Sequence, residues 1–444
     1  MSSKTDRQKN AEKINQVSPS FCLAKWTQVT IDLEHGTNHS CHHPKRHQIP
    51  LEELKKDPAA LHNTSYKKKQ RELMLQGKRP AECSYCWNIE DTKGDHYSDR
   101  IIKSLDPWSF PYLEKVLTAG SEKNFSPTYL EVMFDSTCQL ACSYCLAPIS
   151  TSIMKEMKQF GPYRVHMHEH RMYERDSADI DKKNNPYIEA FWKWLPQIWS
   201  DLEVLRITGG EPLLSPQTSK LLDWIEKNPN PEVTLAINSN LSLPSHHIDK
   251  FLNKVKALRA SNSIKVEFYA SIDTFGQQAE YIRNGLNSNL FWENILKVLD
   301  KSISDQVVLM VTYNILSIPH FDKLISKVVE IKNTGSQLIL DMSYLKEPDY
   351  LMANMLDEKL LNKVKQDFEL MNTPVFNEHE KNKYKRILHW LEQTNRDERI
   401  ERQMADFFTF INEFDRRYQT NFLSTFPELN DFFIECKKAK FLRL

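Results

Sequence analysis

The sequence predicts an α/β fold: a partial (β/α)6 TIM-like barrel with a small N-terminal cysteine-rich auxiliary domain and a helical C-terminal extension. The first observation behind this prediction is an alternation of short apolar runs with longer amphipathic stretches between residues 125 and 345. The second is a helical pattern in the C-terminal part, which we assign to residues 346–444. The third is the length, because 444 residues allow two or three domains or one barrel with additions.

Composition and charge exclude several classes of protein. Apolar residues make up 40% of the chain and charged residues 27%, which supplies a core and argues against global disorder. Lys plus Arg and Asp plus Glu both number 59, so the net charge is zero. The broad basic surface of a general nucleic-acid binder is therefore not expected.

The N-terminal residues 1–20 form a polar tail without the apolar core of a signal peptide. No apolar run in the chain is long enough to cross a membrane, so no membrane span is expected. These features predict a cytoplasmic protein. Because the cytosol keeps thiols reduced, the eight cysteines predict metal binding or catalysis and not structural disulfides.

Six apolar runs of strand length are separated by helical stretches. The predicted strands are Tyr129–Phe134, Val204–Thr208, Val233–Asn238, Val266–Ile272, Val307–Tyr313 and Gln337–Met342. The helical stretches are Tyr187–Trp199, Ile248–Leu258, Phe291–Leu299, Phe321–Ile331 and Glu358–Met371. This alternation indicates βαβ units around a parallel sheet, and six units are too few for a closed eight-stranded barrel. Binding and catalytic groups are expected at the C-terminal ends of the strands.

Three of the cysteines form a CxxxCxxC motif directly after the first predicted strand. They are Cys138, Cys142 and Cys145, in FDSTCQLACSYCLAP, and Tyr144 would add an aromatic wall beside them. Three thiolates on one short loop suit an iron–sulfur cluster whose fourth iron has no protein ligand. The alternative is a zinc site with a distant fourth ligand, because a closed zinc site needs four ligands and the loop supplies three.

Four further cysteines lie in the N-terminal region. Cys83 and Cys86 form a CxxC pair. Cys22 and Cys41 lie on either side of Gly36, which we expect to form a turn between two short strands. Four thiolates close a site completely, and they fit either a 4Fe–4S cluster or structural zinc.

The helical C-terminal part carries an aromatic stripe, which we expect to cover the sheet. The stripe consists of Phe407, Phe408, Ile411, Phe414 and Tyr418, at helical spacing. The eighth cysteine, Cys436, lies in an amphipathic segment. We expect it to be a buried apolar side chain.

The only Gly-Gly pair of the chain follows the second predicted strand, in ITGGEPLL. Gly209 and Gly210 allow a ligand to approach the backbone closely. Glu211 adds a carboxylate, and Pro212 stiffens the exit from the strand. A ligand with an ammonium group suits such an edge, whereas a plain tight turn is the alternative.

Together, the CxxxCxxC loop and the GGEP motif resemble those of the radical S-adenosylmethionine (SAM) enzyme superfamily. The resemblance covers residues 125–345, which we assign to the core barrel. FCLAKW, Gly36, Cys41 and the CSYCW segment resemble the twitch/SPASM auxiliary-cluster domain of the same superfamily, and we assign that domain to residues 21–120. In most relatives this domain follows the barrel, whereas here it precedes the barrel.

The resemblance implies a role for each candidate site residue. Cys138, Cys142 and Cys145 would bind a 4Fe–4S cluster whose open iron is chelated by the amino and carboxylate groups of SAM. Reductive cleavage of SAM would give a 5′-deoxyadenosyl radical that abstracts a hydrogen from a peptide or small-molecule substrate. The expected SAM-binding residues are Gly209, Gly210 and Glu211 at the ammonium, Ser239 and Asn240 at the ribose, and Ser271, Asp273 and Arg283 at the carboxylate and ribose.

The resemblance also implies an auxiliary 4Fe–4S cluster, held by Cys22, Cys41, Cys83 and Cys86. A cluster ligated by four thiolates cannot bind substrate directly, so an electron-transfer or structural role follows. The expected partners are the substrate and an electron donor such as flavodoxin or ferredoxin. Neither a membrane nor a nucleic acid is expected as a partner.

Two other functions are compatible with the sequence. The segment Lys45–Arg79 carries ten Lys or Arg against four acids, which favours a solvated connection but also allows a nucleoside- or RNA-modifying radical SAM enzyme. The other alternative is a non-catalytic zinc-binding protein. The insertion Lys155–Asn185 contains His166, His168 and His170. It is expected to be a substrate-side loop or lid, with a metal site as the alternative.

Overall fold

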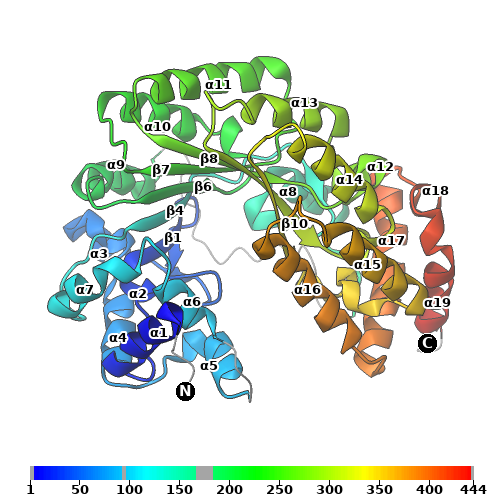
Figure 1. The fold of residues 1–444 in the computed structure, drawn as a ribbon, viewed down its shortest axis with the longest axis horizontal. Helices are drawn as coiled ribbons and strands as arrows, with labels where there is room; N and C mark the ends of the chain where they lie inside the picture. The colour runs from blue at the N-terminus through cyan, green and yellow to red at the C-terminus, as the bar shows by residue number, and fades with distance from the viewer. Residues whose placement is uncertain (1–4, 93–96, 167–183, 442–444) are drawn as a thin grey trace.

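A nine-stranded sheet forms the centre of the protein (Figure 1). The computed structural model describes residues 5–92, 97–166 and 184–441. The strands are β1 Gln28–Asp32, β2 Thr37–His39, β3 His47–Gln48, β4 Tyr129–Met133, β5 Ala141–Cys142, β6 Val204–Thr208, β7 Thr234–Ser239, β8 Lys265–Ser271, β9 Arg283–Asn284, β10 Gln306–Tyr313 and β11 Leu338–Tyr344. The order across the sheet is β11-β10-β8-β7-β6-β4-β1-β2-β3, and β5 and β9 form a separate two-stranded sheet.

The six predicted barrel strands are confirmed. They are β4, β6, β7, β8, β10 and β11, which are parallel neighbours in chain order. Each overlaps its predicted range, because an apolar run of strand length is a local pattern that survives in the fold. Among the described strands, the two edge strands β11 and β3 do not pair with each other, so the barrel is open.

The N-terminal region adds three strands to the same sheet. β1 pairs in parallel with β4, and β2 and β3 continue the sheet in antiparallel pairs. The predicted turn at Gly36 is confirmed, since Gly36 has a φ of +66° and joins β1 to β2. The cysteine-rich region, which the sequence presents as a small domain of its own, therefore shares its sheet with the barrel strands.

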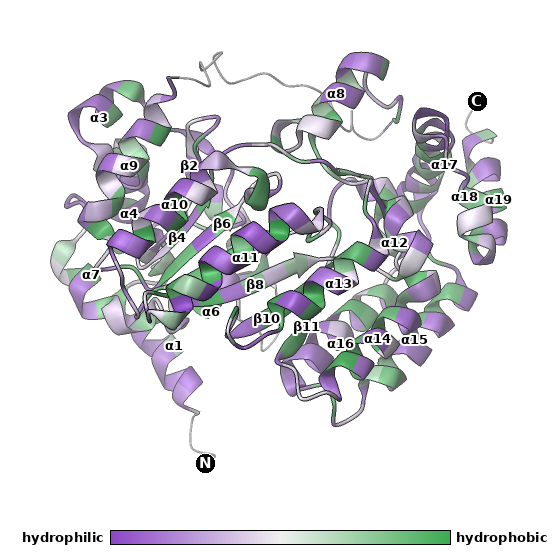
Figure 2. Ribbon diagram, turned by 90° about the horizontal axis from the view of Figure 1, so that it is seen from above, coloured by the Kyte–Doolittle hydropathy of each residue, from purple (hydrophilic) through white to green (hydrophobic). Residues whose placement is uncertain are grey.

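Helices cover one face of the barrel strands, as Figure 1 and Figure 2 show for α10, α11 and α13. The barrel helices are α8 Thr151–Phe160, α9 Pro186–Ile198, α10 Pro216–Lys227, α11 Ser245–Ala260, α12 Gly276–Ile282, α13 Ser288–Val298 and α14 Phe321–Lys332. The N-terminal helices are α1 Asp6–Val17, α2 Ala24–Thr27, α3 Leu51–Lys56, α4 Ser65–Leu75, α5 Ser84–Glu90, α6 Asp99–Ser104 and α7 Leu113–Ala119. Short 3-10 helices lie at Pro58–Leu61, Ala81–Cys83, Phe110–Tyr112, Ala147–Ile149, Pro212–Leu214, Ile318–His320, Asp349–Leu351, Ala353–Met355 and Pro427–Leu429.

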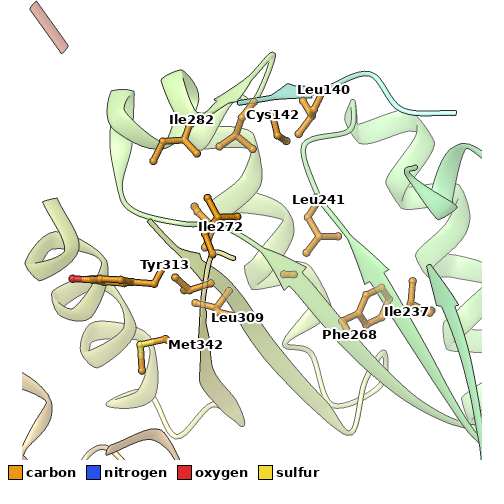
Figure 3. Close-up of a cluster of buried hydrophobic side chains, with 14 of the residues drawn as sticks. Leu140, Cys142, Ile237, Leu241, Phe268, Ile272, Ile282, Leu309, Tyr313 and Met342 are labelled. Carbon is orange, nitrogen blue, oxygen red and sulfur yellow. The ribbon is translucent and has the colours of Figure 1, made fainter. Parts of the chain in front are cut away.

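The main core lies between the barrel strands and the barrel helices (Figure 3). Ile237 of β7, Phe268 of β8 and Leu309 of β10 have no exposed surface. Cys142 and Leu140 belong to the same buried cluster. Burying an apolar side chain of this size stabilises the fold by roughly 1.5–3 kcal/mol. The cysteine loop is therefore anchored on a well-packed part of the protein.

The C-terminal helices lie beside β11, the edge strand at the opposite side of the sheet from β3 (Figure 1). They are α15 Glu358–Met371, α16 Glu378–Glu392, α17 Glu398–Tyr418, α18 Phe422–Thr425 and α19 Asn430–Phe441. At the edge strand β11, Glu380 of α16 accepts a hydrogen bond from the Leu340 amide at 2.8 Å. This contact satisfies an edge amide that could otherwise pair with another chain.

The aromatic stripe of α17 packs on other helices. Phe407 contacts Phe432 of α19 with 5.2 Å between ring centroids, and Phe414 contacts Tyr281 of α12 at 5.2 Å. Cys436 is fully buried in α19, which confirms its prediction as an apolar side chain. Within the described residues, no helix has both the length and the apolar character needed to cross a membrane.

Candidate functional site

The CxxxCxxC loop follows β4 and is held by two elements. In the small sheet, Cys142 of β5 lies opposite Arg283 of β9. At the start of α8, the Cys138 amide donates a hydrogen bond to the Thr151 hydroxyl at 3.1 Å, and the Ser152 hydroxyl donates to the Cys138 carbonyl at 2.7 Å. These contacts position the loop.

The three cysteines line one pocket of about 270 Å³, termed here the triple-cysteine pocket. Its other walls are the C-terminal ends of β6, β7, β8 and β10, where parallel α/β folds place their sites. The predicted residues that line it are Cys138, Cys142, Cys145, Gly209, Gly210, Ser239, Asn240, Ser271 and Arg283. The predicted residues Glu211 and Asp273 are not part of its lining.

Sequence reasoning missed three polar residues of this pocket. Thr208, Asn238 and Thr312 lie at or next to the ends of β6, β7 and β10. Side chains alternate between the two faces of a strand, so a polar residue near the C-terminal end of an otherwise apolar strand indicates such a position. That signal was present in each of the three strands.

Gly209 and Gly210 lie against the cysteine loop. A Cβ atom on Gly210 would stand 2.3 Å from the Thr137 carbonyl oxygen, and a Cβ atom on Gly209 would stand 2.8 Å from the Asp135 carbonyl oxygen. The Glu211 amide also donates a hydrogen bond to the Thr137 carbonyl at 2.6 Å. The two glycines therefore let the end of β6 touch the cysteine loop, besides lining the pocket.

Glu211 connects the ends of β6 and β7. Its carboxylate accepts hydrogen bonds from the Ser239 hydroxyl at 2.8 Å, the Asn240 amide at 2.7 Å and the Leu213 amide at 3.1 Å. Burial raises the pKa of Glu211 to about 7, although these donors oppose the rise. The resemblance places Glu211 at the SAM ammonium. In the structure, its carboxylate holds Ser239 and Asn240, two residues of the pocket wall, in position.

Asp273, Arg283 and Tyr144 form a buried network next to Cys142. Arg283 donates through Nε to Asp273 at 2.9 Å and through Nη2 to the Tyr144 hydroxyl at 2.6 Å, and this hydroxyl donates to Asp273 at 2.8 Å. Although burial alone would lower it, Asp273 and Tyr144 raise the pKa of Arg283 well above its usual value. The network fixes Arg283 as a cation in the pocket wall.

Two nitrogen atoms point at the cysteine sulfurs. Nη1 of Arg283 lies 3.9 Å from Sγ of Cys142, and Nδ2 of Asn240 lies 4.0 Å from Sγ of Cys138. Hydrogen bonds to cysteine sulfur tune the reduction potential of a bound cluster. Sequence reasoning had assigned both residues to SAM alone, because contacts across the pocket leave no local pattern.

The donor set of the triple-cysteine pocket fits a 4Fe–4S cluster with one open iron. Its lining, as far as the structure describes the chain, contains three cysteines and no further Cys, His, Asp or Glu. Burial raises the pKa of Cys138 to about 12, so a metal has to displace the thiol proton when it binds.

The other four cysteines line a second cavity of about 20 Å³, termed here the four-cysteine cavity. Cys22 precedes α2, Cys41 follows β2, Cys83 ends a 3-10 helix and Cys86 lies in α5. Burial raises the pKa of Cys41 and Cys86 to about 12 and that of Cys83 to about 11. The fold thus brings together four thiols that are spread over 65 positions of the sequence (22 to 86).

Buried cations accompany these thiols. Lys25 and Arg100 line the four-cysteine cavity, and Lys25 forms an ion pair with Glu82. Burial would lower the pKa of Lys25, but Cys83 and Glu82 raise it above its usual value. Cations beside cysteines favour the thiolate form, which is the form that binds metals.

Part of the basic segment Lys45–Arg79 is buried. Lys67 of α4 donates to the Gln28 carbonyl at 3.0 Å, and Arg71 donates to the Asn63 side chain at 2.8 Å. Their exposed fractions are 1% and 0%. The prediction of a solvated connection is therefore wrong for these two residues, and neither can contact the phosphates of a nucleic acid.

The insertion contributes one described histidine. His166 is bonded to Asp406 of α17 through Nδ1 at 2.9 Å, and 62% of its side chain is exposed. His168 and His170 lie outside the described residues. Throughout the described chain, no group of three or more His, Cys, Asp or Glu side chains is gathered closely enough to hold a single metal ion. The two cysteine sets line cavities of about 270 Å³ and about 20 Å³.

Comparison with known proteins gives little beyond partial structural similarity. No protein-family model matches the chain, and no curated protein matches it. A structure of TYW1 with a lysine–pyruvate adduct bound is 16% identical over 53% of this chain and 70% of that chain, with a TM-score of 0.28. Streptococcus suis SuiB bound to S-adenosylmethionine is 12% identical over 72% of this chain and 73% of that chain, with a TM-score of 0.29. The assignment of function therefore rests on the two cysteine sites.

Proposed function

We propose that this protein is a radical SAM enzyme. A 4Fe–4S cluster held by the three cysteines, reduced by one electron from a donor, would supply the reductive cleavage of bound SAM to methionine and a 5′-deoxyadenosyl radical, which would abstract a hydrogen from a peptide or small-molecule substrate. One observation carries the proposal: Cys138, Cys142 and Cys145 line the same pocket as Gly209 and Gly210. The cysteines can hold a metal cluster, and the strand end at the two glycines can hold an organic ligand. Because both line one pocket, the cluster and the ligand would lie side by side.

In this proposal, each group of residues that lines the triple-cysteine pocket has a role. The three thiolates ligate three irons and leave a fourth open to a chelating ligand. The backbone at Gly209 and Gly210 offers close polar contact without side chains in the way. Ser271 presents a hydroxyl group that can bind a ribose, and the Ser239 oxygen, whose proton is donated to Glu211, can accept one further hydrogen bond.

Apolar and aromatic side chains complete the walls of the triple-cysteine pocket. Leu140 and Ile149 add apolar surface beside the cysteines, and Tyr144 is held in place by Asp273 and Arg283.

We assign an auxiliary 4Fe–4S cluster to the four-cysteine cavity. Four thiolates suit a fully ligated cluster with an electron-transfer or structural role. Zinc is the alternative occupant, although the four thiols as described do not stand close enough together to hold a single ion. An electron donor such as flavodoxin or ferredoxin completes the proposal, and the cytoplasm stays the predicted compartment.

Product analysis tests the proposal. Protein reconstituted anaerobically with iron and sulfide, then mixed with SAM and dithionite, should release 5′-deoxyadenosine, detected by liquid chromatography. The Cys142→Ala variant is the control and should release none. A fully loaded parent protein that yields no 5′-deoxyadenosine would contradict the proposal.

A further inference from the structure

A third pocket, of about 380 Å³, adjoins both cysteine sites; it is termed here the bridging pocket. Thr208, at the end of β6, lines this pocket and the triple-cysteine pocket. Pro44 lines this pocket and the four-cysteine cavity. A molecule in the bridging pocket would therefore lie next to the place where SAM is proposed to bind.

Strand register places a row of four polar residues across β2, β1, β4 and β6. His39 is opposite Thr30, Thr30 is opposite Glu131, and Glu131 is opposite Arg206. Residues at matching register lie side by side on one face of a sheet. The first three residues of this row line the bridging pocket.

Two buried oxygen atoms of this row have no hydrogen-bond partner among the described residues. They are Oε2 of Glu131 and Oγ1 of Thr30, and each of the two residues is 8% exposed. The other carboxylate oxygen of Glu131 accepts from the Thr208 hydroxyl at 3.3 Å. Buried polar atoms are normally paired, so two adjacent exceptions in a pocket wall indicate a missing donor.

Arg206 does not supply that donor. Its Nε donates to Asn238 at 2.8 Å, its Nη1 donates to the Tyr129 hydroxyl at 3.3 Å, and its guanidinium stacks on Tyr269 at 4.0 Å from the ring centroid. The neighbouring cation is thus turned toward other partners.

Two cations, Lys45 and Arg46, also line the bridging pocket, together with a second carboxylate, Asp32. Both cations are exposed. Arg46 donates through Nη1 to Asp32 at 2.7 Å while 45% of its side chain stays accessible. Exposed cations at the mouth of a pocket suit a carboxylate.

Building on the proposed function, we infer that the bridging pocket is the substrate site and that it binds a small amino-acid-like zwitterion. The primary ammonium group would donate to Glu131 and Thr30, because an ammonium has three donors and no acceptor. The carboxylate would lie toward Lys45 and Arg46. A pocket of this volume holds a molecule of that size, and contact with Thr208 brings the ligand next to the triple-cysteine pocket.

Equilibrium binding tests the ligand class. Reconstituted protein without reductant is titrated in a calorimeter with each of the standard amino acids, with the matching decarboxylated amine and with the matching deaminated acid. At least one amino acid should bind, and both of its truncated analogues should bind at least about tenfold more weakly, because each loses one charged contact. Binding of no amino acid, or equal binding of the analogues, overturns the inference.

Matched variants test the site. Glu131→Gln should weaken binding of that amino acid by about 10- to 100-fold, the usual effect of losing a charged hydrogen bond. The control is Glu267→Gln on β8, where the carboxylate accepts from Tyr269 at 2.9 Å and does not line the pocket. Melting temperature and iron content of both variants check that they fold. Unchanged binding in Glu131→Gln, or equal loss in both variants, overturns the inference.

The same preparations separate this inference from the proposed function. Release of 5′-deoxyadenosine from SAM reports on the triple-cysteine pocket and is measured without the amino acid. Normal SAM cleavage with no amino-acid binding refutes the zwitterion site alone. Absent SAM cleavage with a fully loaded cluster refutes the proposed function itself.

Discussion

The triple-cysteine pocket and the four-cysteine cavity use the same ligand type but differ in their surroundings. The first has about 270 Å³ of space, bounded by glycine backbone and polar strand ends. The second has about 20 Å³, bounded by residues such as Met74, Trp87 and Lys25. The two sites differ both in the number of thiolates and in the volume of free space beside them. A cluster held by three thiolates beside a large space can bind a ligand at its open iron, whereas a cluster held by four thiolates in a small cavity cannot.

Cysteine substitution should separate the two sites most strongly. Cys142→Ala should remove about four irons per chain and abolish SAM cleavage, because it removes a ligand of the open cluster. Cys83→Ala should also remove about four irons but keep SAM cleavage within about tenfold of the parent, since it affects only the auxiliary site. Iron analysis and 5′-deoxyadenosine assays on the same samples measure both effects.

The same experiment distinguishes the occupant of the four-cysteine cavity. If that cavity holds zinc, Cys83→Ala will lower zinc and leave iron unchanged. If Cys83→Ala abolishes SAM cleavage as completely as Cys142→Ala does, the claim that only the triple-cysteine pocket cleaves SAM is wrong.

The buried network beside the triple-cysteine pocket should matter more for stability than a surface ion pair. Arg283→Met leaves Asp273, which is fully buried, without its cation, and should lower the free energy of unfolding by about 3–5 kcal/mol. The control is Arg259→Met, which breaks a partly exposed pair with Asp305 and should lower it by less than about 1 kcal/mol. Denaturant unfolding of the metal-free variants compares them, and equal losses would refute the role of the network.

The diglycine contact should be sensitive to a single methyl group. In Gly210→Ala the Cβ atom would stand 2.3 Å from a backbone oxygen, so β6 or the cysteine loop must shift. We expect a loss of about 1–3 kcal/mol in unfolding free energy and a lower iron content. Gly120→Ala is the control: its φ of +67° and ψ of −155° strain the backbone by about 1–3 kcal/mol, but no atom stands within 4 Å of the new Cβ, so its iron content should not change. Iron content as high in Gly210→Ala as in Gly120→Ala would contradict this account.

Glu211 should give stability a pH dependence. Its pKa in the folded protein is about 7, above the usual 4.5. As pH rises from about 5 to about 7, the unfolded chain loses this proton first, so the free energy of unfolding should fall by up to about 3 kcal/mol. Unfolding of metal-free Glu211→Gln at each pH should lack this decrease. Parallel pH profiles of parent and variant would show that Glu211 is not responsible.

Local patterns predicted much of this protein, and non-local contacts account for what they missed. The barrel strands and the helix α9 lie where apolar runs and helical periodicity predict them. The pairing of β1 with β4 left no local signal, because roughly a hundred residues separate Gln28 from its partner Tyr129. Buried Lys67 in α4 escaped notice for the same reason, since its acceptor is the distant Gln28 carbonyl.

The candidate site shows the same division. The cysteine spacing predicted which sulfurs share a pocket, because three of them lie on one loop. The spacing could not show that Glu211 bonds to Ser239 and Asn240, or that Arg283 bonds to Asp273, since each contact joins two strand ends. The bridging pocket was invisible in the sequence, because its polar row depends on the register of four strands.

Electron paramagnetic resonance of the reduced Cys83→Ala variant, recorded with and without SAM, tests the central claim most directly. This variant isolates the triple-cysteine pocket, where an open iron can bind the amino and carboxylate groups of SAM. The account predicts a 4Fe–4S signal that changes when SAM is added. A 4Fe–4S signal that stays the same with saturating SAM, or a variant that holds no iron, would contradict it.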